Sequence, residues 1–444
     1  MINQSNLIAK EETTKENRVW VRISAACNEK CLFCLDSEAQ DGRLIPEDII
    51  KKQIREWFRP GYTNRVILSG WEATINPKFS DYITYARELW YDRIQTVTNG
   101  NMFSLPKFCD KVIGLWLQEV TFSLHGHTAQ LHDYLTATPW SFRKALKWLI
   151  YLRKYYPHVI INIDIVVNKI NVDFLPRIVS FYMGLWIREF DILQIIPFGR
   201  GFSEYKNQLF YTIAEHIEAL HDTWKLSKLP GVYMWTNRFP AEAFEWYEDL
   251  IQDPRKIKSE TMGESLEMFD PFIRSLWAKK PECFGEACDV CFLKQYCHGF
   301  IESIDAPISY FKNPFILWEK DKNPTESHEH IILRGDEFPS ETYKKYGTST
   351  QEFLHSIRAL PLQDNQKLVN IPPCVRSSNN TLLYEDYNNL REEYSVADYT
   401  KNYVKNLYRK KSLDCKKCKF NNTCQGMHIN FIRAYGFEIL HPIE

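Results

Sequence analysis

Three cysteines close together in the chain could bind an iron–sulfur cluster. Cys27, Cys31 and Cys34 lie in the segment CNEKCLFC, directly after a predicted strand at 19–25. Three thiolates can hold three irons of a four-iron cluster and leave the fourth iron open to a substrate or cofactor. The alternatives are simple buried cysteines or a zinc knuckle, but zinc needs a fourth Cys or His at a comparable spacing, and none follows before Cys109.

Eight further cysteines form two sets in the second half of the chain: Cys283, Cys288, Cys291 and Cys297, and then Cys374, Cys415, Cys418 and Cys424. The segments CDVCFLKQYCHG (288–299) and CKKCKFNNTCQG (415–426) share the pattern C-x2-C-x5-C-x-G and form an internal repeat. Each repeat has a preceding cysteine as a fourth ligand. The pattern therefore predicts two closed four-cysteine sites, for either zinc or iron–sulfur clusters. Cys109, the twelfth cysteine, is expected to be a small buried side chain of a helix.

The elements that must position the first set alternate between strands and helices. Six β-rich runs are separated by segments of helical periodicity, and they lie at 19–25, 64–70, 93–100, 118–126, 159–169 and 190–199. Such alternation predicts an α/β fold with a parallel sheet and right-handed crossovers, either a partial barrel or an open doubly wound sheet. In both, functional residues gather at the carboxyl ends of the strands.

The order of motifs along these strands resembles the radical S-adenosylmethionine (radical SAM) superfamily. CNEKCLFC matches its C-x3-C-x2-C signature, and the resemblance covers about residues 18–230. It continues in SGWEATINP (69–77), TNG (98–100), FSLHG (122–126), VVNKIN (166–171) and IIPFG (195–199). The resemblance implies a partial (β/α)6 TIM-like barrel. It also implies that Cys27, Cys31 and Cys34 bind a 4Fe–4S cluster whose open iron chelates SAM. Reductive cleavage of SAM would then give a 5′-deoxyadenosyl radical that abstracts a substrate hydrogen.

The same resemblance assigns the residues that bind SAM: Phe33, Gly70, Glu72, Asn99 and Ser123. Gly70 and Glu72 would hold the methionine amino group, Phe33 would pack on the adenine, and Ser123 would contact the ribose. A strand-end hydroxyl that satisfies the backbone is the alternative for Ser123.

Histidines and a carboxylate beyond the fourth strand are candidates for acid–base catalysis. The segment SLHGHTAQLHD contains His125, His127 and Asp133, close to a predicted strand end. A hydrogen-bonded loop with solvated histidines is the alternative. Asp164 and Gln194, on the fifth and sixth strands, are expected to contact SAM or substrate if they point inward.

The cysteine repeat resembles the SPASM or twitch auxiliary domains of the superfamily, although its spacing is not the standard SPASM string. We expect a tail at 1–17, a radical SAM core at 18–234, a helical bridge at 235–280 and an auxiliary domain with two 4Fe–4S clusters at 281–444. The resemblance favours oxidative modification of a peptide or protein, with flavodoxin or ferredoxin as electron donor. Because only about 17 residues precede the first strand, a peptide would need a separate recognition protein or would dock on 301–373. The alternative is dehydrogenation or epimerisation of a small molecule.

Tryptophan stands where glycine is expected at several positions. Trp71 replaces the second glycine of the Gly-Gly-Glu stretch, and Trp90, Trp116, Trp140 and Trp186 lie where such folds turn on glycine. The chain has 17 Gly and 13 Trp, whereas average usage predicts roughly 31 Gly. Some bacterial lineages read UGA as glycine, so our hypothesis is that several of these positions are glycine in the native protein. Trp235 has no such context. If Trp71 is genuine and blocks the SAM site, the chain is instead a non-catalytic iron–sulfur or zinc-binding protein.

Charge and hydropathy exclude some classes of function. Lys plus Arg is 55 and Asp plus Glu is 56, giving a net charge of −1, which argues against a dedicated nucleic-acid binder. No apolar run approaches the roughly 20 residues needed to cross a bilayer, and the N-terminal segment is not a secretory signal. With 12 cysteines, a metal-binding protein of the cytoplasm is expected.

Overall fold

The computed structural model describes residues 17–37, 40–262, 284–305, 316–317, 330–333, 338–362, 366–376, 384 and 396–444. The chain divides into two compact units between Phe239 and Pro240. The sequence analysis had placed the end of the core at 234. None of the described helices is long and apolar enough to span a bilayer.

The first unit contains a seven-stranded parallel sheet in sequential order, curled into a half-barrel. Its strands are β1 (Asn17–Arg22), β2 (Thr63–Ser69), β3 (Arg93–Thr98), β4 (Glu119–Ser123), β5 (Ile160–Val167), β6 (Glu189–Gln194) and β7 (Tyr233–Asn237). This confirms the predicted α/β partial barrel. The seventh strand was not predicted, and it lies across the expected boundary at 234.

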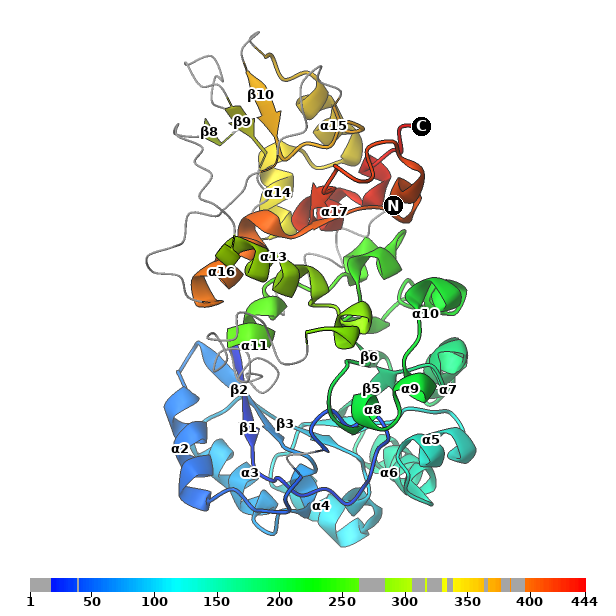
Figure 1. The fold of residues 1–444 in the computed structure, drawn as a ribbon. Coiled ribbons are helices and arrows are strands. Elements are labelled where there is room, and N and C mark those ends of the chain that lie inside the picture. The colour runs from blue at the N-terminus through cyan, green and yellow to red at the C-terminus, as the bar shows by residue number, and fades with distance from the viewer. Residues whose placement is uncertain are drawn as a thin grey trace. The chain divides into compact units, whose positions relative to one another are not determined.

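Helices follow the strands and surround the sheet, as the ribbon of Figure 1 shows. They are α2 (Glu47–Trp57), α3 (Phe79–Glu88), α4 (Pro106–Gly114), α5 (Ala129–Leu135), α6 (Ser141–Tyr155), α7 (Leu175–Gly184), α8 (Gly199–Ser203), α9 (Lys206–Leu209) and α10 (Ile217–Leu226). α2 illustrates why they form. Ile50 and Ile54, four residues apart, are fully buried, while Glu47 and Asp48 occupy the first turn, where acidic side chains favour the helix.

The second unit has short elements. Its helices are α11 (Lys256–Met262), α13 (Lys294–Asp305), α14 (Pro339–Tyr346), α15 (Thr350–Arg358), α16 (Val396–Asn402) and α17 (Ile429–Tyr435). Its strands are β8 (Ile316–Leu317), β9 (His330–Ile332), β10 (Lys367–Val369), β11 (Arg409–Lys410) and β12 (Met427–His428). Aromatic stacking joins α15 to α17, where the rings of Phe353 and Tyr435 lie 4.3 Å apart. Residues 263–280 of the predicted bridge lie outside the described residues.

Five tryptophans have positive φ angles: Trp90, Trp116, Trp140, Trp186 and Trp246. They account for five of the eight described non-glycine residues with positive φ. This backbone region is rare for bulky residues and is the one that glycine favours. The structure thus places all four turn tryptophans singled out in the sequence in the conformation expected of glycine, and it adds Trp246. Trp235 has no positive φ, and its indole Nε1 donates to Glu189 Oε1 at 3.1 Å.

Candidate functional site

A cavity of about 260 Å³ lies at the carboxyl ends of the strands in the first unit. The loop after β1 contributes Cys27, Cys31, Phe33 and Cys34, and later strand ends contribute Gly70, Trp71, Asn99, Ser123, His125, Asp164, Gln194 and Arg238. The three cysteines of the first set and most of the predicted SAM-binding residues therefore meet at one cavity. Glu72 is the exception, because it is not among the residues that line it.

The start of α8, the first helix after β6, supports the cysteine loop. Gly199 has φ +58°, and a Cβ there would lie 2.2 Å from the carbonyl oxygen of Leu35, so only glycine fits. The backbone N–H of Arg200 donates to the carbonyl of Cys34 at 3.2 Å and to Ser37 Oγ at 2.7 Å. Sequence reasoning named IIPFG as a strand end but missed this contact. The signal was the glycine that ends the motif.

The thiols of the loop are poor acids in this environment. Burial raises the pKa of Cys27 to about 12 and raises the pKa values of Cys31 and Cys34. Thiolates at this site therefore need a cationic partner. Among the described residues, no three Cys, His, Asp or Glu side chains are arranged to hold a single metal ion.

Glu72 fastens the end of β2 to the end of β3. Its carboxylate accepts hydrogen bonds from the backbone N–H of Asn99 at 2.7 Å, from Thr98 Oγ1 at 2.8 Å and from Thr74 N at 3.0 Å. Burial raises the pKa of this carboxyl. The carboxylate thus ties the backbone of Asn99 to the end of β2. Asn99 lines the cavity, and its Nδ2 donates to Asn28 Oδ1 at 2.6 Å.

Gly70 and Trp71 form the wall of the cavity beside the cysteine loop. Gly70 has φ +134°, and a Cβ there would lie 2.4 Å from the carbonyl oxygen of Ser24, so glycine is required. Trp71 has no positive φ. Its indole Nε1 donates to the carbonyl of Asp36 at 2.9 Å, and the guanidinium of Arg22 lies 5.3 Å from the ring centre. The indole thus stands at the cavity wall.

Of the three catalytic candidates, only His125 lies at the cavity. Its ring packs edge-on against Phe33 at 4.6 Å, and its Nδ1 accepts a hydrogen bond from Val166 N at 3.1 Å. Burial lowers the pKa of His125 well below its usual value, so the ring is neutral near pH 7. With Nδ1 accepting, the proton sits on Nε2, and the neutral ring is a hydrogen-bond donor through that atom.

His127 and Asp133 lie elsewhere. The Asp133 carboxylate accepts hydrogen bonds from the backbone N–H groups of Trp140 and Phe142, both at 2.8 Å, at the start of α6. His127 does not line the cavity, and its ring lies 6.0 Å from that of Phe174. The structure gives Asp133 the role of stabilising a helix N-terminus.

Ser123, Asp164 and Asp191 occupy paired positions on β4, β5 and β6. Because paired residues of parallel strands face the same side of a sheet, these side chains form a polar row, in which Ser123 Oγ lies 3.5 Å from Asp164 Oδ2. Burial and the nearby charge of Asp191 raise the pKa of Asp164 to about 8, against the opposing effect of Arg238. Sequence reasoning identified Asp164 as an inward-facing candidate and missed Arg238, which follows the unpredicted strand β7.

Asp164 should make the stability of the fold depend on pH. The folded protein keeps the proton on this carboxyl to about pH 8, whereas an exposed aspartate loses it near pH 4. Stability should therefore fall as pH rises between these values. We expect Asp164→Asn to remove this loss. The Tm of the variant should therefore exceed that of the wild type by several degrees more at pH 9 than at pH 5. Thermal unfolding with exposed Asp92→Asn as control measures the gap, and an equal gap at both pH values contradicts the prediction.

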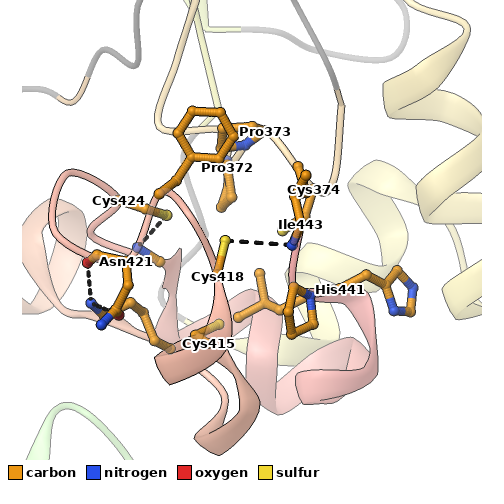
Figure 2. Close-up of a pocket in the computed structure, with 14 residues that line it drawn as sticks. Pro372, Pro373, Cys374, Cys415, Cys418, Asn421, Cys424, His441 and Ile443 are labelled. Atoms are coloured by element: carbon orange, nitrogen blue, oxygen red, sulfur yellow. Dashed lines mark hydrogen bonds between the residues drawn. The ribbon is translucent and has the colours of Figure 1, made fainter.

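The second unit brings four cysteines together. Cys374, Cys415, Cys418 and Cys424 line one small cavity, which is otherwise mostly apolar, and Figure 2 shows them around a common space. Backbone N–H groups point at three of the sulfur atoms. Ile443 N donates to Cys418 Sγ at 3.5 Å and Gly426 N to Cys424 Sγ at 3.3 Å. Burial raises the pKa of Cys374 to about 11, and a backbone hydrogen bond from His441 opposes this rise. Such N–H···S bonds stabilise thiolates that bind a cluster.

The other predicted four-cysteine set is seen only in part, because Cys283 lies outside the described residues. Cys288 lies in the middle of a helical turn at Glu286–Val290, Cys291 directly follows that turn, and Cys297 lies on α13. Cys109 is fully buried on α4, as predicted.

The fold and site together define an α/β half-barrel with a three-cysteine loop at the carboxyl edge of its sheet. Residues 21–174 match the radical SAM superfamily. This match confirms the resemblance stated from the motifs.

Similar proteins perform several different reactions. An AdoMet-dependent heme synthase of Methanosarcina barkeri is 25% identical over 183 residues, which are 40% of this chain and 50% of that protein. A probable GTP 3′,8-cyclase of Saccharolobus solfataricus is 24% identical over 203 residues, 45% of this chain and 64% of that protein. The chain thus spans less than two thirds of either relative. The solved structure of Streptococcus suis SuiB bound to the precursor peptide SuiA has a TM-score of 0.45 at 15% identity, covering 68% of this chain and 77% of that one.

Proposed function

We propose that this chain is a radical SAM enzyme that reductively cleaves SAM and abstracts a hydrogen atom from a peptide or protein. The observation that carries the proposal is the meeting of Cys27, Cys31 and Cys34 with Gly70 and Ser123 at one cavity. The three thiols leave one iron of a cubane without a protein ligand. With a 4Fe–4S cluster and SAM bound, the chemistry supplied is cleavage of the sulfonium to methionine and a 5′-deoxyadenosyl radical.

The residues of the chain bind and orient the cofactor. The backbone at Gly70, which carries no Cβ, lets the methionine end of SAM approach β2 closely. Phe33, held edge-on by His125, offers an apolar face for the adenine. Ser123 supplies a hydroxyl for the ribose, and Asn99, fixed by Glu72, supplies an amide at the end of β3.

Two auxiliary 4Fe–4S clusters belong to the same proposal. Support comes from the cavity surrounded by Cys374, Cys415, Cys418 and Cys424 and from the N–H groups directed at its sulfur atoms. The repeated pattern extends the proposal to Cys283, Cys288, Cys291 and Cys297. A closed cluster bound by these cysteines would supply an electron acceptor for oxidation of the substrate, which favours oxidative modification of the peptide. An electron donor such as flavodoxin or ferredoxin is then required, and a separate recognition protein can deliver the peptide.

The test is formation of 5′-deoxyadenosine and methionine from SAM by anaerobically reconstituted protein reduced with dithionite. The expected result is both products in equal amounts. The proposal fails if neither forms while the protein holds iron at the first cysteine set and a candidate peptide is present.

Cys415→Ser tests the auxiliary site by itself. We expect this variant to hold about four fewer irons per chain than the wild type, because a cluster that loses one of four thiolates is poorly retained. It should still bind the cluster at Cys27, Cys31 and Cys34. Iron and zinc analysis measures the change. The matched control is Cys109→Ala, whose buried thiol is on a helix of the first unit. Loss of one zinc instead of about four irons would contradict the cluster assignment.

A further inference from the structure

Three tryptophans end helices in the same way. Trp90 follows the end of α3, Trp116 the end of α4 and Trp186 the end of α7. Their φ angles are 68°, 89° and 65°, respectively. In each case the N–H of the tryptophan donates to the carbonyl three residues earlier, at 2.9 to 3.0 Å. The next residue, Tyr91, Leu117 or Ile187, donates to the carbonyl five residues before it, at 3.1 to 3.2 Å. These paired bonds define the Schellman motif, in which the left-handed residue is usually glycine.

The side chains of these tryptophans contribute little to the fold. Trp90 is 83% exposed, Trp116 49% and Trp186 72%, whereas the residue after each is buried. Arg87 lies over the ring of Trp116 and Arg188 over that of Trp186, at 5.2 and 5.5 Å. Cation–π contacts at exposed sites are weak. The backbone at these positions therefore demands glycine, and the side chain adds no buried contact.

Trp140 and Trp246 repeat the observation outside the Schellman motifs. Trp140 precedes α6 with φ 69°, and Trp246 follows a short helical turn with φ 74°. They are 60% and 67% exposed. In contrast, Trp148 and Trp224 have no positive φ, are almost fully buried and pack against Tyr151 and Phe239. These seven tryptophans thus fall into two groups, five placed like glycine and two placed like genuine core tryptophan.

We infer that Trp90, Trp116, Trp140, Trp186 and Trp246 are glycine in the protein as its own host makes it, encoded by UGA. The inference does not depend on the proposed function, because it rests on backbone conformation alone. The positive φ angles assign glycine to these five positions. Trp148 and Trp224, which have no positive φ, remain tryptophan encoded by UGG.

The test is peptide mass spectrometry of the protein purified from its host, together with the gene sequence. The expected result is glycine with TGA codons at the five positions and tryptophan with TGG codons at 148 and 224, which serve as internal controls. Tryptophan at Trp90, Trp116 and Trp186 would overturn the inference, and so would glycine at 148 and 224, because that would break the link to backbone conformation.

A recombinant chain supplies a second, independent readout. Releasing a non-glycine residue from the left-handed region should raise stability, so we expect Trp90→Gly, Trp116→Gly and Trp186→Gly each to raise the Tm by about 2–4 °C. The matched control is Trp57→Gly, at the end of α2, where the tryptophan is also exposed but has no positive φ. Glycine there should lower the Tm. Lower Tm values for all four variants would contradict the inference.

Discussion

Replacing Trp71 with glycine is expected to raise the rate of 5′-deoxyadenosine formation by about tenfold or more. The indole lines the same cavity as Cys27, Cys31 and Cys34, next to a glycine whose backbone has no room for a Cβ. An indole at this wall competes for space with a cofactor that must approach the β2 backbone. A gain of tenfold corresponds to about 1.4 kcal/mol of relieved interference, which is modest for removing an aromatic side chain from a binding site.

The measurement compares reconstituted wild type and Trp71→Gly at equal iron content, with Trp57→Gly as a control for loss of an exposed tryptophan far from the cavity wall. Equal rates for wild type and Trp71→Gly would mean that the cavity tolerates the indole. If neither protein cleaves SAM although the first cluster is intact, either a substrate is required or the chain is a binding protein.

Replacing Cys31 with serine is expected to abolish SAM cleavage. Cys31 is the middle cysteine of the loop, and it lines the cavity. The Arg200 guanidinium donates a hydrogen bond to the carbonyl of Cys31, and the Arg200 backbone N–H donates to that of Cys34. Loss of one of three thiolates leaves a cluster with too few protein ligands to persist. 5′-Deoxyadenosine should fall to the background of unreconstituted protein, and iron should fall by about four per chain.

Cys109→Ala is the matched control for this variant. Its thiol is fully buried in the same unit but packs in the helix α4. This variant should keep its iron and its activity and lose only some stability through the small cavity. If Cys31→Ser retained full activity, the assignment of the first cluster would be wrong.

The sequence was sufficient for the half-barrel and for the cysteine loop because both depend on local patterns. Strands that alternate with helices form a parallel sheet whatever the exact residues of each element. Three cysteines within one short loop remain close together wherever that loop lies. β7 was missed because its five residues precede a charged, helix-like segment that dominated the interpretation. Arg238 at the cavity was missed with it.

Side-chain roles were harder to predict where two strands cooperate. Glu72 was assigned to the methionine amino group, and that role stays a prediction. Its partners Thr98 and Asn99 come from the neighbouring strand, and only the folded chain brings them to it. Asp133 was a catalytic candidate because it lies near a strand end, and that role stays a prediction. The hydrogen bonds of its carboxylate to the start of α6 could not be predicted from the sequence. The tryptophans show the opposite case. Their odd positions were visible in the sequence because glycine has a recognisable place after a helix.

The left-handed tryptophans also determine how this protein can be produced. A host with the standard genetic code stops translation at UGA. With UGA at position 90, the released fragment would contain β1 and β2 alone of the seven strands, and it would lack both auxiliary cysteine sets. Two strands bury too little apolar surface to fold independently. Expression of the unaltered gene in such a host would therefore yield short, aggregation-prone chains, and a synthetic gene with glycine codons at the five positions should yield the full-length protein.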